Sequence, residues 1–173
     1  STLDVHSGNV FRFRPDGSHV EIYSWGQVNP FGLCWDRYGN LYSADCHSNP
    51  ITQLIRGAYY PSFGKPHDGL GFGPVMCEHS HGSTGLCGII YIDGGIWGPE
   101  WDDQMFLGNC VTSKVNHDKI TFTGSTPKAN EAPDFMTSDD LWFRPVDLQL
   151  GPDNALYIAD FYNKIIGHYE VPL

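Results

Sequence analysis

The sequence predicts an all-β fold, a β-propeller assembled from four-stranded blades. The first observation is a 16-residue pattern that occurs twice without a gap, over residues 30–45 and 145–160, at an offset of 115 residues. Each copy reads as an alternating apolar strand, a turn rich in Gly, Asn and Asp, and a second strand ending in a carboxylate, which is the pattern of a β-hairpin. A looser third copy has strands at 88–92 and 104–109, and no stretch shows a sustained helical period. Repeated hairpins without helices indicate a propeller.

Additional β-like runs supply the outer strands of the blades. One such run follows each hairpin, at residues 51–55, 111–120 and 165–171. The N-terminal part contributes one more pair, residues 10–13 and 19–23, joined by the turn Arg14-Pro15-Asp16-Gly17. Each complete unit therefore consists of a hairpin and its following strands.

Counting these units gives roughly three and a half blades, whereas closed propellers usually carry about four to eight. The expected division is two outer strands of one blade at 1–26, a blade with a long functional loop at 27–85, a blade at 86–125, and an incomplete last blade at 126–173. We therefore expect a part of a larger propeller whose remaining blades lie outside this chain. The alternative is a complete small domain of unusual topology.

Composition excludes several classes of partner. The 173 residues carry a formal charge of −10, with only ten Lys and Arg, which argues against nucleic acid and against anionic membrane surfaces. No apolar run is long enough to span a membrane, and because the chain begins at Ser1, a leader could have been removed. The five cysteines form no metal-binding spacing, although Cys77 and Cys87, which flank a glycine-rich loop, could pair.

The loop from Arg56 to Gly88 is the segment richest in chemical groups, and it is too long for a simple connector. His79 and His81 lie two residues apart, so in an extended chain their side chains point the same way and could bind one metal ion. The alternative is that loop carbonyls and water satisfy both imidazoles. The candidate third ligands are Glu78, His67, Asp68 and His47.

Asp45 and Asp160 end equivalent strands of the two hairpins, at a position expected near one rim of the propeller. Each carboxylate could bind a cation such as calcium, or could accept hydrogen bonds from turn amides. Arg144 and Asn29 precede the equivalent first strands, which in a propeller border the central channel. Arg144 could clamp an anionic ligand there, or could pair with Asp139 or Asp140.

Several motifs together resemble the planctomycete-type membrane-bound dehydrogenase domain and, more distantly, the soluble pyrroloquinoline-quinone (PQQ) sugar dehydrogenases, which are six-bladed propellers. The resemblance covers essentially the whole chain and is carried by the segments 29–33, 41–45, 56–61, 81–85, 124–127, 143–147, 151–153 and 159–163. The sequence departs from the sugar dehydrogenases at several expected pocket positions, and Val28 and Trp142 stand where that family has arginines.

The resemblance implies a periplasmic or secreted six-bladed propeller that binds PQQ and is joined in one polypeptide to a c-type haem domain. It places the cofactor near Asn29, Thr84 and Arg144. Calcium is the metal expected at Asp45 and Asp160, because carboxylate and carbonyl oxygens are abundant at the loop ends.

Two hypotheses follow for the function. In the first, the propeller oxidises a sugar or an alcohol and passes electrons to the haem domain. In the second, it is a non-catalytic scaffold whose rim loops bind a glycan or a partner protein. Sugar stacking suits either hypothesis, and the candidate aromatic residues are Tyr59, Tyr60, Phe63, Trp97 and Trp101.

Overall fold

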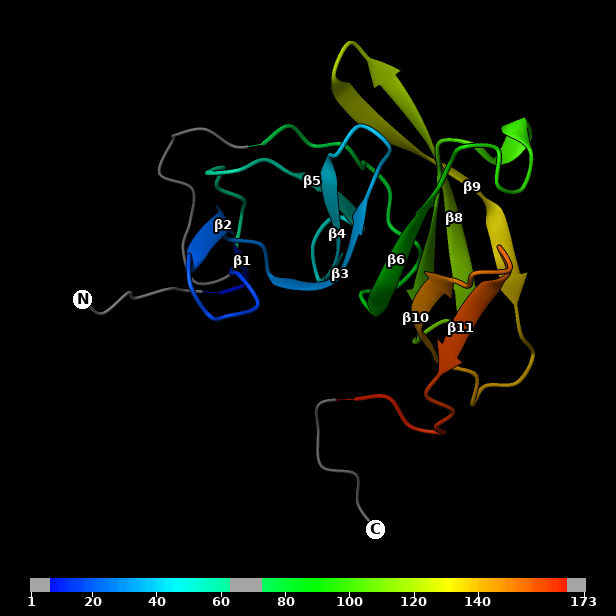
Figure 1. Cartoon of the computed structure of the whole chain (residues 1–173). Helices are drawn as coiled ribbons and strands as arrows, with labels where there is room; N and C mark the ends of the chain where they lie inside the picture. The colour runs from blue at the N-terminus through cyan, green and yellow to red at the C-terminus, as the bar shows by residue number, and fades with distance from the viewer. Residues whose placement is uncertain (1–6, 63–72, 168–173) are drawn as a thin grey trace.

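The computed structural model describes residues 7–62 and 73–167, and these residues form an almost entirely β structure (Figure 1). Four antiparallel sheets follow one another along the chain, as the all-β propeller prediction requires. Their strands are β1 (Asn9–Arg12) with β2 (Glu21–Trp25), β3 (Asn29–Trp35) with β4 (Leu41–Cys46) and β5 (Ile51–Leu54), β6 (Leu86–Ile92) with β7 (Gln104–Asn109), β8 (Lys114–Thr123) and β9 (Thr126–Thr137), and β10 (Pro145–Leu150) with β11 (Leu156–Asp160). One 3₁₀ turn, Pro99–Trp101, precedes β7.

The two copies of the repeated pattern fold into hairpins with the same register. Pro30 lies opposite Asp45 in β3–β4, and Pro145 lies opposite Asp160 in β10–β11, with a register shift just after each proline. Both turns are closed by the same backbone hydrogen bond, from Asp36 N to Asn40 O at 3.0 Å and from Gly151 N to Ala155 O at 2.9 Å. Gly39 and its counterpart Asn154 both have positive φ, which explains why the turn uses Gly and Asn there. The sequence repeat is therefore a structural repeat.

The outer strands differ in part from their predicted positions. β9 pairs with β8 along most of its length, so the four-stranded sheet runs to Thr137, past the division expected at residue 125. β8 begins at Lys114 rather than at 111, because residues 110–113 form the turn after β7. No strand is present at 165–167, and the rest of the predicted strand 165–171 lies outside the described residues.

The hydrophobic core consists of layers between successive sheets. The largest layer joins the β3–β5 sheet to the β6–β9 sheet and contains Tyr42, Ile51, Leu86, Met105 and Leu107. Smaller layers lie between the first two sheets and between the last two. The core is thus divided among the sheet interfaces, as expected for side-by-side packing of blades.

The first strands of neighbouring sheets approach each other closely at glycines. A Cβ atom on Gly32 of β3 would lie 2.6 Å from the carbonyl oxygen of Cys87 in β6, and one on Gly88 of β6 would lie 2.6 Å from the Cα of Asp147 in β10. Only glycine leaves room for backbone at these distances. The strands β3, β6 and β10 therefore form an inner layer packed backbone to backbone.

One face of β3 carries a stripe of exposed apolar side chains. Phe31, Leu33 and Trp35 are 59%, 50% and 57% exposed, although they alternate as the buried face of a strand does. Among the described residues, the neighbouring β1–β2 sheet has two strands, and it covers this stripe incompletely. A stripe of this kind is typical of a surface that another element packs against.

Candidate functional site

The segment 73–85 crosses from the β3–β5 sheet to the β6–β9 sheet and contributes to two adjacent sites. Its start, Gly73–Met76, lines a cavity, and His79 and His81 follow a few residues later. The segment is fixed to the four-stranded sheet by a hydrogen bond from Ala129 N to Met76 O at 2.8 Å, and Met76 and Cys77 are buried in the main core layer. The described second part of the loop singled out by the sequence is therefore anchored to the four-stranded sheet.

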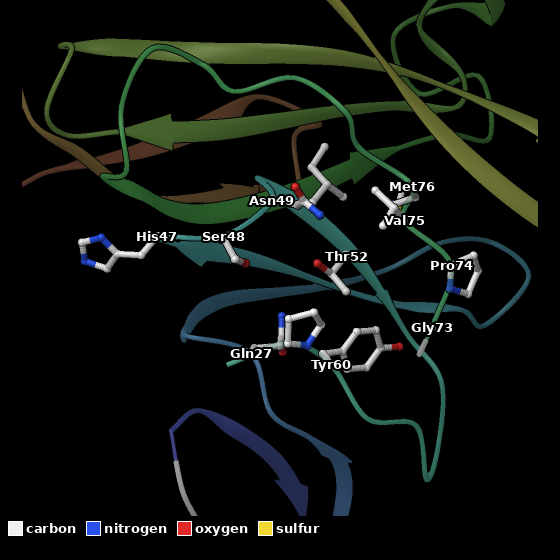
Figure 2. Close-up of a pocket in the computed structure, with 12 residues that line it drawn as sticks. Gln27, His47, Ser48, Asn49, Thr52, Tyr60, Gly73, Pro74, Val75 and Met76 are labelled. Carbon is white, nitrogen blue, oxygen red and sulfur yellow. The ribbon is translucent and has the colours of Figure 1, made fainter. Parts of the chain in front are cut away.

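The cavity has a volume of about 380 Å³ and lies between β5 and the start of this segment (Figure 2). Its polar lining is neutral apart from one imidazole: Gln27, Ser48, Asn49 and Thr52 contribute amides and hydroxyls, and His47 completes the set. Figure 2 shows the His47 ring at one end of the cavity, turned away from Tyr60. Tyr60 donates a hydrogen bond to Gln53 O at 2.6 Å and accepts one from Ile55 N, and burial raises the pKa of its phenol. The rest of the lining is apolar and comes from Ile51, Pro61, Pro74, Val75 and Met76, so the cavity fits a small uncharged ligand that has both apolar and polar groups.

Gln27 is the most unusual residue in the cavity wall. Its side chain is buried, and its Nε2 donates to Ser43 Oγ at 2.7 Å, whereas its Oε1 has no hydrogen-bond partner among the described residues. Its backbone also has a positive φ of 71°, which is strained for a residue other than glycine. A buried, unpaired acceptor in a strained backbone is a typical mark of a ligand site. Sequence reasoning missed Gln27, because neither its φ nor its burial follows from residue type.

The two histidines meet a buried carboxylate that the sequence analysis missed. His79 Nε2 lies 2.7 Å from Asp118 Oδ1, and His81 Nε2 lies 2.6 Å from Asp118 Oδ2. Asp118 lies on β8 and is fully buried, and the two imidazole rings pack edge to face with centroids 4.8 Å apart. The available signal was a carboxylate within the predicted strand 111–120.

The other candidate third ligands do not join this cluster. Glu78 pairs instead with Lys128, and His47 lies at the cavity. His67 and Asp68 lie outside the described residues. Among residues 7–62 and 73–167, His79, His81 and Asp118 are the set of donors close enough to hold one ion.

Asp45 and Asp160 cap their hairpins instead of facing the histidines. The Oδ1 of Asp45 accepts a hydrogen bond from Asn29 N at 2.7 Å, and the Oδ1 of Asp160 accepts the equivalent bond from Arg144 N at 2.8 Å. Asp45 also accepts hydrogen bonds from Val28 N and Ser48 Oγ, and burial raises the pKa of its carboxyl group. The geometry matches the amide-accepting alternative.

Arg144 uses its guanidinium to hold backbone carbonyls. Nε donates to Asn163 O at 2.9 Å, Nη1 donates to Cys110 O at 2.8 Å, and Nη2 donates to Lys164 O at 3.1 Å. The side chain is buried and contacts neither Asp139 nor Asp140 through any of these bonds. It joins the turn after β7 to the segment after β11.

The remaining predicted residues lie apart from the cavity. Asn29 and Thr84 are exposed, and neither they nor Arg144 line the 380 Å³ cavity. Of the aromatic residues considered for sugar stacking, Tyr60 lines the cavity, whereas Trp97 and Trp101 pack on Phe106 and Phe135. Phe63 lies outside the described residues.

Cys87 lies next to Cys110 and not next to Cys77, the partner considered from the sequence. Cys77 contacts the imidazole of His79 at 3.6 Å, whereas Cys87 Sγ lies 3.5 Å from Cys110 Sγ. The hydrogen bond from Cys87 lowers the pKa of the Cys110 thiol, and the nearby positive charge of Arg144 lowers it further. Cys87 lies on β6, and Cys110 directly follows the neighbouring strand β7.

Comparison with solved structures defines the class of fold. The chain is similar to a protein described as a candidate oxidoreductase (glucose dehydrogenase) from Thermus thermophilus, with 18% identity, a TM-score of 0.64, and coverage of 88% of this chain and 43% of that one. It is also similar to the soluble aldose sugar dehydrogenase from Escherichia coli in its apo form, with 20% identity, a TM-score of 0.52, and coverage of 83% and 45%. This chain therefore has the propeller fold of these proteins and spans less than half of their length.

Comparison of the sequence with models of protein families shows the family of this chain. The chain belongs to a family defined as a domain of unknown function, DUF7133, whose model matches residues 2–172. A search of the curated proteins finds no match. In the part of the chain that the structure describes, no helix is long and apolar enough to cross a membrane.

Proposed function

We propose that the protein containing this chain is an oxidoreductase that acts on a sugar or a related alcohol. The observation that carries the proposal is the cavity beside β5, whose polar lining consists of neutral amides and hydroxyls with one imidazole and suits the hydroxyl groups of a sugar. The fold shared with glucose and aldose sugar dehydrogenases supports it. Within this proposal the chain is a planctomycete-type membrane-bound dehydrogenase domain that passes electrons to a c-type haem domain.

The cofactor of this reaction would have to be held mainly outside the described residues. PQQ carries three carboxylates and needs several cationic partners, but the Arg144 guanidinium is occupied by backbone carbonyls. Asn29 and Thr84 do not converge with it on the cavity. The described residues therefore do not by themselves fit PQQ, and we assign its cationic clamp to other blades.

Calcium has no fitted site among the residues first considered for it. The carboxylate oxygens of Asp45 and Asp160 accept backbone amides, and the histidine cluster offers nitrogen donors, which calcium disfavours. A calcium requirement of the complete protein would therefore involve other residues.

The exposed stripe Phe31, Leu33 and Trp35 supports the proposal that further blades belong to the protein. These side chains lie beside a sheet that has two strands in the described part of the chain, where the inner strands of another blade would pack. The similar structures are also more than twice as long as the part that this chain covers.

A glycan-binding scaffold without chemistry is the second candidate function. It is favoured by the orientation of His47, whose ring is turned away from the interior of the cavity, because oxidation of a hydroxyl group needs a base within reach of its proton (Figure 2). Both candidate functions require binding of a sugar, but only the first includes its oxidation.

Replacing Gln27 with methionine is expected to weaken aldose binding about tenfold, because the buried amide of the cavity wall and its hydrogen bond to Ser43 Oγ are lost. Isothermal titration of aldoses into the intact polypeptide measures this, and dye reduction with PQQ, with and without calcium, measures turnover. Gln149→Met, at an exposed position of β10, is the matched control and should bind as the wild type does. Equal aldose affinity in the wild type, Gln27→Met and Gln149→Met would contradict the sugar site. Aldose binding by the wild type without turnover would support the glycan-binding scaffold instead.

Periplasmic or secreted localisation is part of the proposal. The oxidation state of the cysteines tests it. In an oxidising compartment, Cys87 and Cys110 are expected to form a disulfide, each thiol losing one proton and one electron as a disulfide oxidant is reduced to its dithiol. Their sulfur atoms are 3.5 Å apart and need to approach by about 1.5 Å. Thiol titration of the denatured protein, purified without reductant, should then find two fewer thiols than the reduced sample. Equal counts would argue against an oxidising compartment.

A further inference from the structure

We propose that His79, His81 and Asp118 form a binding site for a divalent transition-metal ion of the zinc class. The ligands would be one nitrogen from each imidazole and one oxygen from the carboxylate. The proposal does not depend on the oxidoreductase function, because it rests on residues outside the cavity lining.

The donor atoms already lie close together. The three ligand atoms are all within 4.8 Å of one another, and the two contacts from histidine to Asp118 measure 2.7 and 2.6 Å. Tetrahedral zinc with bonds of about 2.0–2.1 Å places its donors about 3.3 Å apart. To admit the ion, the contact between His79 Nε2 and Asp118 Oδ1 has to open by about 0.6 Å, and any donor pair wider than this spacing, within the 4.8 Å limit, has to close.

The carboxylate has an unsatisfied atom in this site. Asp118 Oδ1 is buried and makes no hydrogen bond, although His79 Nε2 lies only 2.7 Å away, because that contact is poorly aligned. Leaving a buried carboxylate oxygen unpaired is costly. A metal ion between Oδ1 and His79 would satisfy it, and this favours an ion over a purely hydrogen-bonded clamp.

The ligands are held by rigid neighbours of the kind that metal sites use. Asp118 lies in the middle of the four-stranded sheet, opposite Met105 of β7 and Glu131 of β9. The Glu131 carboxylate, on a side chain that is 54% exposed, lies 3.5 Å from His81 Nδ1, and this contact leaves Nε2 for the metal. Asn109 donates a hydrogen bond to His81 O at 3.1 Å and fixes the backbone of the loop.

The site has an open side. The side chain of His79 is 19% exposed, whereas those of His81 and Asp118 are almost completely buried. An ion can therefore reach the cluster past His79, and a water molecule can fill the remaining coordination position. Nitrogen donors in this set favour zinc or a neighbouring transition metal over calcium.

Asp118→Asn tests the site, because asparagine keeps the shape of the side chain and removes its charge. The intact polypeptide, stripped with chelator and dialysed against zinc, should retain about one zinc ion at this site, and Asp118→Asn should weaken binding by about 100-fold or more. The matched control is Asp134→Asn, because Asp134 is a carboxylate on neighbouring β9 that binds Lys114 and Asn116 instead of the histidines. This control should bind zinc as the wild type does.

Two further measurements keep the test decisive. If Asp118→Asn does not fold, His79→Gln on the exposed side replaces it, with the same expected loss. Cobalt substitution should give the intense visible absorption of a four-coordinate site, and Glu131→Gln should weaken binding by about 10- to 100-fold. Folded wild-type protein without zinc at this site, or equal losses in Asp118→Asn and Asp134→Asn, would overturn the proposal.

Discussion

Replacing Arg144 with alanine is expected to lower the free energy of unfolding by about 3 kcal/mol, because several charge-assisted hydrogen bonds are lost together. The guanidinium donates to Cys110 O in one hairpin and to Asn163 O and Lys164 O beyond β11. In the alanine variant these carbonyls lose their donor, and the last hairpin loses its attachment to the turn after β7. Urea unfolding of the intact polypeptide, followed by tryptophan fluorescence, measures the loss.

Two variants separate this structural role from a general effect of charge. Arg144→Lys keeps the charge, but its single ammonium cannot reach carbonyls on both sides, so it should recover only part of the stability. Arg56 is exposed and pairs with Glu21 at 2.8 Å, and Arg56→Ala should change stability little. If Arg144→Ala unfolded like the wild type and lost only cofactor-dependent activity, Arg144 would be an anion clamp after all.

Replacing Gly32 with alanine is expected to cost about 2–3 kcal/mol by overpacking the inner layer. The added methyl carbon would lie 2.6 Å from Cys87 O, 2.9 Å from Ile89 N and 3.0 Å from the Cα of Gly88. All three atoms belong to the backbone of β6, so no side chain can move aside, and the two sheets have to separate. Urea unfolding of the intact polypeptide measures the cost.

Gly39→Ala is the control for this effect. Gly39 has a φ of 82°, but no atom lies within 4 Å of its added Cβ, so alanine there meets backbone strain without a clash. We expect this variant to lose about 1 kcal/mol. Equal losses at the two positions would show that the close approach of β3 and β6 contributes nothing of its own.

The hairpins could be predicted from the sequence because local chemistry determines them. The turns require Gly39 and Asn154 at positive φ, and the alternating strands require a buried face, so residue type alone carries the information. The position of β9 was harder to predict. Its 12 residues pair with β8 in the same sheet, and a repeat-based division at residue 125 has no means of detecting that pairing.

The candidate sites were predictable only in part. His79 and His81 were found because their spacing places both side chains on one side of an extended segment. Their partner Asp118 is 37 residues from His81, and a contact across that separation depends on the packing of the loop against the four-stranded sheet. Gln27 became visible only through its burial and its unpaired oxygen, which are properties of the folded chain.

The shared caps of the two hairpins also bear on how such a repeat can diverge after gene duplication. Asp45 and Asp160 each bind the backbone N–H of the residue at the start of the partner strand, so the cap places no demand on that residue's side chain. The cap itself is therefore kept whichever side chain stands at this position. One copy carries the exposed Asn29, and the other carries Arg144, which fastens the end of the described chain. Duplicated blades can acquire new roles first at such positions.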